Sequence, residues 1–427
     1  MFKKSILKIG TLFTAAVIML SGCAGGVTDS SSKIMSALSN IQSSTSSAAP
    51  EYKEANASIG STGDILMHSP ILDAYNFNGK YDFHDMFKYV KSYYEKFDLT
   101  VANLELSLGG KERGYSGYPT FNCPDSILDA LYDSGVNEVT AANNHCFDMG
   151  ESGFLRTLNT LDKHKIEYLG TRVSTEIKPY KVTEINGIKI GRINYTYETV
   201  PLNGKKALNG IPVTDDCAEL INSFNYEKLD DFYNEIKERI DMMYSDGAEA
   251  IMVYIHWGDE YKLESNGWQK QIAQKLCDLG VDVIVGNHPH VIEPVELYSS
   301  EVSGKQTVCL YSLGNEVSNQ RKDRMDMTTG HTEDGMIFRT DFKRNKDGSV
   351  ILDKVDVLPT WVNLYIGSDS RRNYEIIPLD KSANWQDFGL SSTYDAEQSY
   401  KRTMKLVKKG LDDVAKNYVK KDLRKVG

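Results

Sequence analysis

Five stretches of the chain end an apolar run with side chains that commonly bind metal ions. They are "GD" (63–64), "ANLE" (102–105), "AANNHCFDMG" (141–150), "YIHWGDEY" (254–261) and "GNHPHV" (286–291). In α/β sheets, ligands bind where the carboxyl ends of the strands meet. We therefore expect one cleft whose metal ligands are carboxylate, amide and imidazole groups, from Asp64, Glu105, Asn144, His256, His288 and His290.

A mixed set of oxygen and nitrogen ligands suits a divalent ion such as Mn, Zn, Fe or Mg. We expect Mn, Zn or Fe in particular, in a number that the sequence leaves open. Pro289 stands between His288 and His290, and its fixed backbone would lower the entropy cost of ordering two ligands.

Each of these positions also has an ordinary structural interpretation. Asp64 could cap a helix or a turn, Glu105 could be solvated, and His256 could be a core histidine. The combination favours a site, because four of the eight histidines stand at three strand ends: His145, His256, His288 and His290. The other four (His68, His84, His164 and His331) fall on expected helices or loops and receive no role.

The sequence motifs of several other enzyme and nucleotide-binding classes are absent from the chain. The chain has no G-x-S-x-G nucleophile elbow, no G-x-x-x-x-G-K-[ST] phosphate loop and no H-E-x-x-H zinc motif. A G-x-G-x-x-G dinucleotide fingerprint after the first expected strand is also missing. A metal-dependent hydrolase is the enzyme class that the sequence still favours.

The elements that must position these groups alternate as in an α/β protein. Strands are expected over 57–66, 98–105, 136–145, 166–170, 248–258, 281–290 and 306–315, with a hairpin over 180–197 and antiparallel strands over 335–364. Helices are expected over 83–97, 126–135, 152–165, 227–245, 267–279 and 393–424. In the last helix, Met404, Val407, Leu411, Val414 and Tyr418 recur at helical spacing, as docking onto the domain requires.

The N-terminus indicates an extracytoplasmic, membrane-anchored protein. Lys3, Lys4 and Lys8 precede the apolar run 9–20, which is too short to span a bilayer comfortably. "LSGC" (20–23) resembles a bacterial lipobox, so residues 1–22 would be a signal peptide and Cys23 the lipidated first residue. An ordinary signal peptide with an incidental cysteine is the alternative. The Ser-rich stretch 23–50 would then be a tether.

The net charge limits the classes of partner that we expect, and the cysteine spacing indicates the state of the thiols. The net charge of −10 argues against a general nucleic-acid binder. The segment from Lys401 to Gly427 carries ten Lys or Arg against three Asp, so a local contact with a polyanion or a membrane surface stays open, beside the plain interpretation of a solvated helix face. The five cysteines after Cys23 are widely spaced, so we expect free and mostly buried thiols, with one optional bridge.

Six motifs, in order and spacing, resemble the CapA family of poly-γ-glutamate capsule synthesis proteins: "GDILM", "ANLE", "NNHCFDMG", "HWGDEY", "GNHPHV" and "YSLGN". The resemblance covers roughly residues 57–320. It implies a fold related to calcineurin-like metallophosphoesterases, a four-layer β-sandwich flanked by helices, over residues 51–345. Residues 346–427 would complete this domain with strands and a basic helix.

The resemblance also implies roles for single residues. Asp64 would bind a first metal, Glu105 would lie near a bridging position, Asn144 would bind a second metal, and His256, His288 and His290 would be further ligands. His145 would be the acid that protonates a leaving oxygen, with Asp148 as its catalytic partner. Substrate-binding candidates lie in the same motifs: Asn103, Asn143, Trp257, Glu260 and Asn315.

The sequence departs from the superfamily in places that touch the metal site. Phosphoesterases usually carry Asp-x-His at the first strand, whereas Ile65 and Leu66 follow Asp64 here. "NLE" stands where they have Gly-Asp. Two further residues differ from the CapA pattern itself: Glu316 follows "YSLGN" where an aromatic residue is more usual, and Glu293 stands where glutamine is expected.

Two functions from different classes are compatible with these features. One is a surface-anchored, metal-dependent hydrolase or transferase in poly-γ-glutamate synthesis or export, acting on a phosphoester or on the amide of an anionic polymer. The other is a non-catalytic subunit that holds the polyanion for a membrane polymer synthase.

Overall fold

The computed structural model describes residues 52–424. Cys23, the signal-peptide segment and the tether lie outside the described residues. Residues Glu51–Gly427 form one compact unit.

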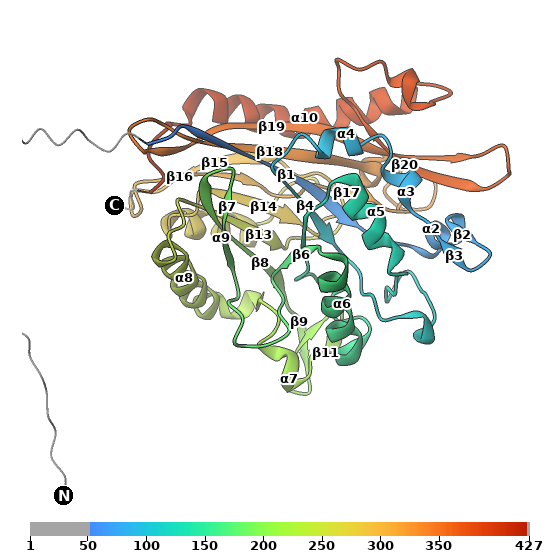
Figure 1. Cartoon of the computed structure of the whole chain (residues 1–427), viewed down its shortest axis with the longest axis horizontal. Coiled ribbons are helices and arrows are strands. Elements are labelled where there is room, and N and C mark those ends of the chain that lie inside the picture. Colours follow the sequence, from blue (N-terminus) through green and yellow to red (C-terminus); the bar gives the residue numbers. More distant parts are fainter. Residues whose placement is uncertain (1–51, 425–427) are drawn as a thin grey trace, which may run out of the picture. The chain divides into compact units, whose positions relative to one another are not determined.

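Two β-sheets pack face to face in the centre of the protein (Figure 1). The first sheet, in the order β20-β19-β18-β1-β4-β5-β6, consists of β20 (Arg372–Pro378), β19 (Val350–Ile366), β18 (Asp334–Arg344), β1 (Ala55–Ile65), β4 (Leu99–Leu104), β5 (Glu138–Thr140) and β6 (Glu167–Leu169), and β17 (Asn315–Val317) pairs with β1. The second, in the order β12-β8-β13-β14-β16-β15, consists of β12 (Ser223–Phe224), β8 (Ile188–Tyr197), β13 (Ala250–His256), β14 (Val283–Asn287), β16 (Gln306–Leu310) and β15 (Val295–Ser299), and β7 (Lys181–Ile185) pairs with β8.

Helices cover the outer face of each sheet and produce four layers. The first sheet packs against α2 (Ser69–Ala74), α3 (His84–Phe87), α4 (Lys91–Tyr94), α5 (Ser126–Ser134) and α6 (Gly150–His164). The second packs against α8 (Leu229–Ser245) and α9 (Gly267–Asp278). The expected α/β class with a helix-flanked sandwich is confirmed.

The parallel strands explain the continuous apolar runs in the sequence. β1, β4, β5 and β6 run parallel in one sheet, and β8, β13, β14 and β16 in the other. Every residue of β13 and β14 is buried, because these strands have a packed layer on both faces. Their polar residues therefore appear only where the strands end.

Short elements complete the chain. A small sheet contains β9 (Thr199–Leu202), β10 (Lys205–Leu208) and β11 (Ile211–Pro212), and β2 (Asn76–Phe77) pairs with β3 (Lys80–Tyr81). α7 (Asp215–Ala218) follows β11, and 3₁₀ turns lie at Lys111–Arg113, Tyr226–Lys228, His331–Glu333 and Trp385–Phe388. Among the elements described for residues 52–424, no helix combines the length and apolar character that crossing a bilayer requires.

Several expectations about element bounds were wrong. The strands expected over 281–290 and 306–315 end earlier, at Asn287 and Leu310. The helix expected over 83–97 is two short helices, because several turns there close on the residue three positions back, as in Val90 N to Phe87 O. The strand expected over 136–145 ends at Thr140, so the segment with Asn143 and His145 is a loop. The last helix, α10 (Tyr394–Asn417), ends before 424, and its tail returns to the sheet through Leu423 N to Val350 O.

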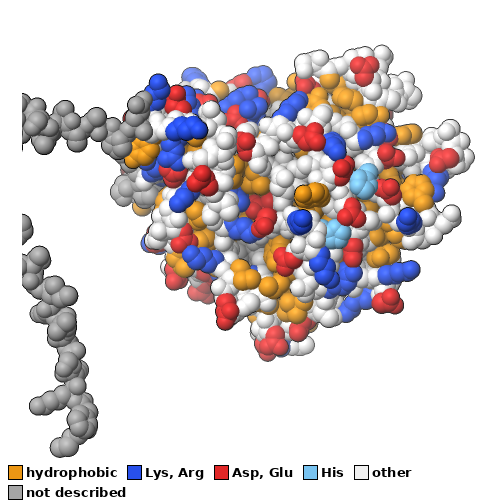
Figure 2. Space-filling view, viewed as in Figure 1, with side chains coloured by type: hydrophobic (Ala, Val, Ile, Leu, Met, Phe, Trp, Pro, Cys, Tyr) orange, Lys and Arg blue, Asp and Glu red, His pale blue; other side chains and the backbone are white. Residues whose placement is uncertain are grey.

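The apolar stripe of α10 docks as expected. Val407 and Val414 are buried in the core between the sheets, and Met404, Leu411 and Tyr418 pack against that core. The five described cysteines are free and buried, also as expected. Over the face shown in Figure 2, acidic and basic side chains are interspersed.

The crossing of α10 over the edge strand β15 depends on Gly410. A Cβ at this position would overlap the carbonyl oxygen of Val295, whereas a Cβ at Gly267, in the first turn of α9, would meet open space. We expect Gly410→Ala to lower the free energy of unfolding by about 1–3 kcal/mol, because the helix must shift away from the strand.

Gly267→Ala is the matched control, and we expect it to be neutral or stabilising by up to about 1 kcal/mol. Urea unfolding of the two variants measures both effects. Equal stability of the two variants would show that the close crossing is not needed.

Candidate metal centre

The carboxyl ends of strands from both sheets converge at one end of the sandwich. Asp64 is the penultimate residue of β1 and β4 leads into Glu105, while β13 ends at His256 and β14 leads into His288 and His290. Parallel pairing of β1 with β4 and of β13 with β14 aligns these ends. Each of these five side chains is at least nine-tenths buried.

Asp64 is the polar residue to which both sheets connect. Its Oδ1 accepts hydrogen bonds of 2.8 Å from Asn103 Nδ2 on β4 and of 2.8 Å from Asn287 Nδ2 on β14. Its Oδ2 lies 3.1 Å from His290 Nδ1 and accepts a 3.3 Å bond from the His288 backbone N–H. The carboxylate is therefore fixed in position before any ligand binds.

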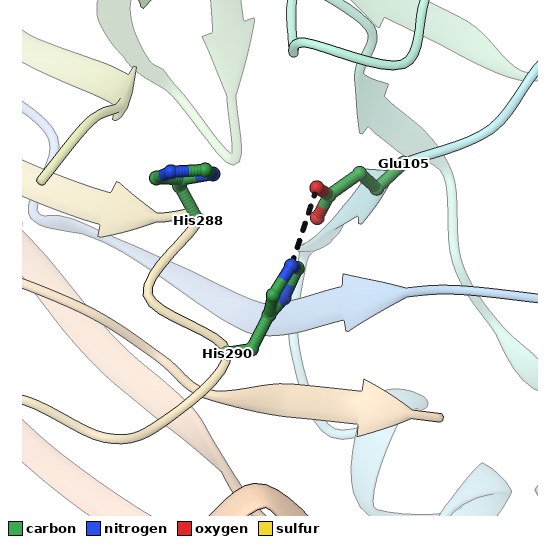
Figure 3. A group of neighbouring side chains, drawn as sticks. All are labelled: Glu105, His288 and His290. Carbon is green, nitrogen blue, oxygen red and sulfur yellow. Dashed lines mark ion pairs between the residues drawn. The ribbon is translucent and has the colours of Figure 1, made fainter. Parts of the chain in front are cut away.

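Two overlapping groups have the geometry of metal ligands. Asp64, Glu105 and His256 each offer an atom within 4.8 Å of the others, and so do Glu105, His288 and His290. Figure 3 shows the second group, in which both imidazoles project from the loop after β14 toward Glu105. Glu105 Oε1 lies 3.3 Å from His256 Nε2 and 3.8 Å from His290 Nε2. Glu105 is shared by both groups, as a bridging ligand would be.

Two polar atoms of this cluster are buried with no hydrogen-bond partner among the described residues. They are Glu105 Oε1 and His288 Nδ1. A buried carboxylate oxygen and a buried imidazole nitrogen without partners are costly, and a bound cation would satisfy both. Their donor types also suit Mn, Zn or Fe. The residues present therefore fit a metal ion.

Burial sets the protonation of the ligands. It raises the pKa of Glu105 well above its usual range, and the negative charges of Asp64, Glu260 and Asp148 raise it further. Burial alone would raise the pKa of Asp64 too, but the hydrogen bond and charge of His290 hold it below its usual value. Burial lowers the pKa of His256 to about 3, and that of His288 well below its usual range. Both imidazoles are thus neutral, as metal ligands must be.

The loop between β14 and Ile292 is strained. His288 and His290 have φ angles of 100° and 55°, in the left-handed region that non-glycine residues avoid. Such residues cost of order 1–3 kcal/mol each and persist where the surroundings enforce them. Here the Tyr261 N–H bonds to Pro289 O at 2.8 Å, and Asn315 Nδ2 bonds to His290 O at 3.1 Å. The strain turns both imidazoles toward Glu105.

His145 and Asp148 form a second polar unit beside the cluster. Asp148 Oδ2 lies 2.8 Å from His145 Nδ1 and also accepts the Phe121 backbone N–H at 2.7 Å. The Phe121 ring meets the His145 ring edge to face, with centroids 4.8 Å apart. With Nδ1 directed at Asp148, Nε2 is the nitrogen that can face a ligand. Asn144 joins this loop to the cluster, since its Oδ1 lies 2.8 Å from His256 Nε2.

The structure places the substrate-binding candidates in different surroundings. Asn103 lies in the middle of the candidate site, where it donates to Asp64. Asn143 stabilises the loop that contains His145 by donating to Leu104 O at 2.8 Å. Glu260 is exposed at the rim. Asn315 is buried under the His290 loop, and Trp257 packs beneath α8 and α9 with its indole N–H bonded to Tyr311 O at 2.9 Å. Asn315 and Trp257 therefore support the site from behind.

Three residues at the site were missed. Asn287 directly precedes the two histidines and follows a buried run, a signal that the sequence offered. Tyr197, whose ring centroid is 4.7 Å from that of His288, ends β8 in the same way. Asn209 follows β10 and donates to Asp148 Oδ1 at 2.9 Å. Nothing in its local sequence indicated this long-range contact.

Because burial and the neighbouring negative charges raise the pKa of Glu105, a proton competes with a metal ion for this carboxylate. We expect proton release on metal uptake and an affinity that rises with pH, by up to about tenfold per unit while pH is below the pKa of Glu105. Titration calorimetry in two buffers of different ionisation enthalpy measures the released protons. Glu105→Gln should bind more weakly and release fewer protons, and equal proton release in both proteins would contradict the assignment.

Comparison with known proteins assigns the chain that forms this site to a family. The family described as "Bacterial capsule synthesis protein PGA_cap" matches residues 58–320. The "PGA biosynthesis protein CapA" of Bacillus subtilis (strain 168) is 26% identical over 358 residues, which is 82% of this chain and 85% of that protein. The "Capsule biosynthesis protein CapA" of Bacillus anthracis is 26% identical over 338 residues, 76% of this chain and 74% of that protein.

The solved structure of TT1561 from Thermus thermophilus covers 70% of this chain and 97% of its own, at 8% identity and a TM-score of 0.35, a likeness too slight to bear on function. The family match, by contrast, spans more than half of the chain and includes all the candidate ligands. The chain therefore belongs to the bacterial capsule synthesis protein family PGA_cap, the CapA family.

Proposed function

We propose that the protein is a surface-anchored component of poly-γ-glutamate capsule synthesis or export, with a metal-dependent hydrolase-type cleft. The two Bacillus relatives are named as capsule or PGA biosynthesis proteins, and these names support poly-γ-glutamate as the polymer that this protein handles. The substrate bond would be an amide of the anionic polymer or a phosphoester. The partners would be the polymer and the subunits of a membrane polymer synthase.

One observation carries the metal part of this proposal. Glu105 Oε1 and His288 Nδ1 are buried without partners at the point where strand ends from both sheets converge. Asp64, His256 and His290 complete the ligand set, with Asn144 beside His256. When bound there, a divalent ion would lower the pKa of a water molecule and withdraw charge from the scissile group.

The protein's own residues would handle the proton and the orientation. His145 would donate a proton from Nε2 to the leaving oxygen or nitrogen. Asp148 would hold the imidazole in this orientation through Nδ1, as the 2.8 Å contact supports. The edge of Phe121 against the His145 ring would restrict rotation of the imidazole.

A second function, polyanion binding without turnover, has an observation of its own. A groove of about 660 Å³ lies between β15 and α10, and its charged lining residues are three lysines (Lys405, Lys409 and Lys416) and three acids (Glu296, Asp412 and Asp413). Among residues 52–424, these lysines form no ion pair within 4.0 Å. Unpaired ammonium groups along one helix would attract a polycarboxylate.

Metal content is the first test. Protein purified without chelator or affinity metal should contain about one to two equivalents of Mn, Zn or Fe by elemental mass spectrometry. His256→Ala should lose most of it, since His256 lies in the ligand set, whereas His84→Ala, at an exposed histidine outside the site, should keep it. A folded protein that takes up no metal on titration would exclude the metal-dependent function.

Turnover separates the two functions. With metal bound, His145→Ala should cut hydrolysis of poly-γ-glutamate or of a model phosphoester by about 10²-fold or more while keeping its metal, because it removes the general acid. Capsule output in cells carrying each variant completes the test. Output that survives His145→Ala but not His256→Ala would favour the binding role over the hydrolase.

The proposal also includes the anchor. Residues 1–22 would be removed as a signal peptide, Cys23 would carry the lipid, and residues 23–50 would link it to the domain of 51–345 and 346–427. Cys23→Ser should move the protein from the membrane fraction to the soluble or secreted fraction, since a lipid chain supplies the attachment. Unchanged membrane association in that variant would rule out the lipid anchor.

A further inference from the structure

A line of aromatic rings runs from the metal centre to the protein surface. Tyr197 lies against two candidate ligands, with ring centroids 4.7 Å from His288 and 6.4 Å from His256. Tyr226 follows at 6.2 Å from Tyr197, and Trp268 at 6.0 Å from Tyr226. We call Tyr197, Tyr226 and Trp268 the aromatic track.

Exposure increases along the track. His256 is 1% exposed, Tyr197 and Tyr226 are half-buried, and Trp268 is 48% exposed. The other three tryptophans, Trp257, Trp361 and Trp385, are 0%, 5% and 7% exposed. The chain thus leaves one indole in water, at the outer end of a path that begins at the candidate centre. The exposed face of this indole is a surface on which a ligand could stack.

The track is held rigidly. Trp268 is in the first turn of α9, where Asn266 and Gln269 form a reciprocal capping box. The Tyr226 hydroxyl accepts the Gly258 backbone N–H at 3.0 Å. Rings fixed by such contacts lose little further entropy when a ligand stacks on them.

The charges around the track select against a bare polycarboxylate. The exposed charged residues of 226–231 and 258–270 are six acids and three lysines: Glu227, Asp230, Asp231, Asp259, Glu260 and Glu264, and Lys228, Lys262 and Lys270. An acidic rim repels polyanions. It can accept hydrogen bonds from hydroxyl groups, while aromatic faces pack against C–H groups. A small organic cation would need rings around one point, whereas these rings lie in a row.

We propose that the aromatic track binds a linear, uncharged glycan chain and leads it toward the metal centre. The inference rests on the proposed function only in taking the inner end of the track as a reaction centre.

The single exposed tryptophan makes the test selective. Caesium ion, a cationic quencher that the acidic rim does not repel, should quench chiefly the Trp268 fluorescence of the whole purified protein, since the other three indoles are buried. Chitohexaose or cellohexaose should protect this fluorescence saturably, and calorimetry should give the matching Kd. Poly-γ-glutamate and choline are run in parallel.

Matched variants then identify the surface. Trp268→Ala should weaken glycan binding by about tenfold, Trp268→Phe should weaken it less, and Tyr132→Ala, at an exposed aromatic on α5 in the opposite layer, should leave it unchanged. Circular dichroism confirms that each variant is folded.

Three results would overturn the proposal: no saturable protection by either glycan, binding that Trp268→Ala leaves intact, or protection by poly-γ-glutamate or choline alone. The binding assay needs neither metal nor turnover. A failure of the metal hypothesis would therefore appear as absent metal with glycan binding intact, and can be told apart from a failure of this inference.

Discussion

The buried carboxylate of Asp64 is the interaction on which the rest of the site depends. It accepts hydrogen bonds from Asn103 in one sheet and from Asn287 and the His288 backbone in the other, and so joins the two sheets at their carboxyl ends. A buried carboxylate is costly to desolvate unless it is fully hydrogen-bonded. Asp64 meets this requirement with His290 as a further partner. These bonds help to position the candidate metal ligands. The ligands lie on strand ends or loops that Asp64 bonds to directly, or on strands that pair with those.

Glu105 is fully buried like Asp64, but its carboxylate lacks the same set of hydrogen-bond partners. One oxygen of Glu105 lacks a partner, its pKa is raised, and two imidazoles approach it. The left-handed backbone of His288 and His290 adds strain at the same point. Unsatisfied polar atoms and strained backbone lower stability, and proteins keep them where function requires them. Both costs fall on the groups that a divalent ion would satisfy, so one ligand would relieve them together.

The surroundings of the site divide into two kinds of surface. Near the candidate metal centre, the aromatic track emerges between the acidic segments 226–231 and 258–270. Away from it, α10 covers the edge strand β15 and presents lysines along a groove. Covering an edge strand also removes a site of unwanted strand pairing. One domain thus offers an acidic, aromatic surface near the site and a groove of mixed charge away from it.

The sequence by itself determined the α/β class, most strands and helices, and the ligand motifs, because buried parallel strands are continuous apolar runs that end in polar residues. Asp64, Glu105, His256 and His290 could be named from that pattern alone. Only the tertiary structure decided that residues 83–97 form two short helices, that Trp257 and Asn315 support the site from behind, and that Asn209 reaches Asp148 from 61 residues away. These outcomes depend on contacts between segments far apart in the chain, and local sequence patterns carry no record of such contacts.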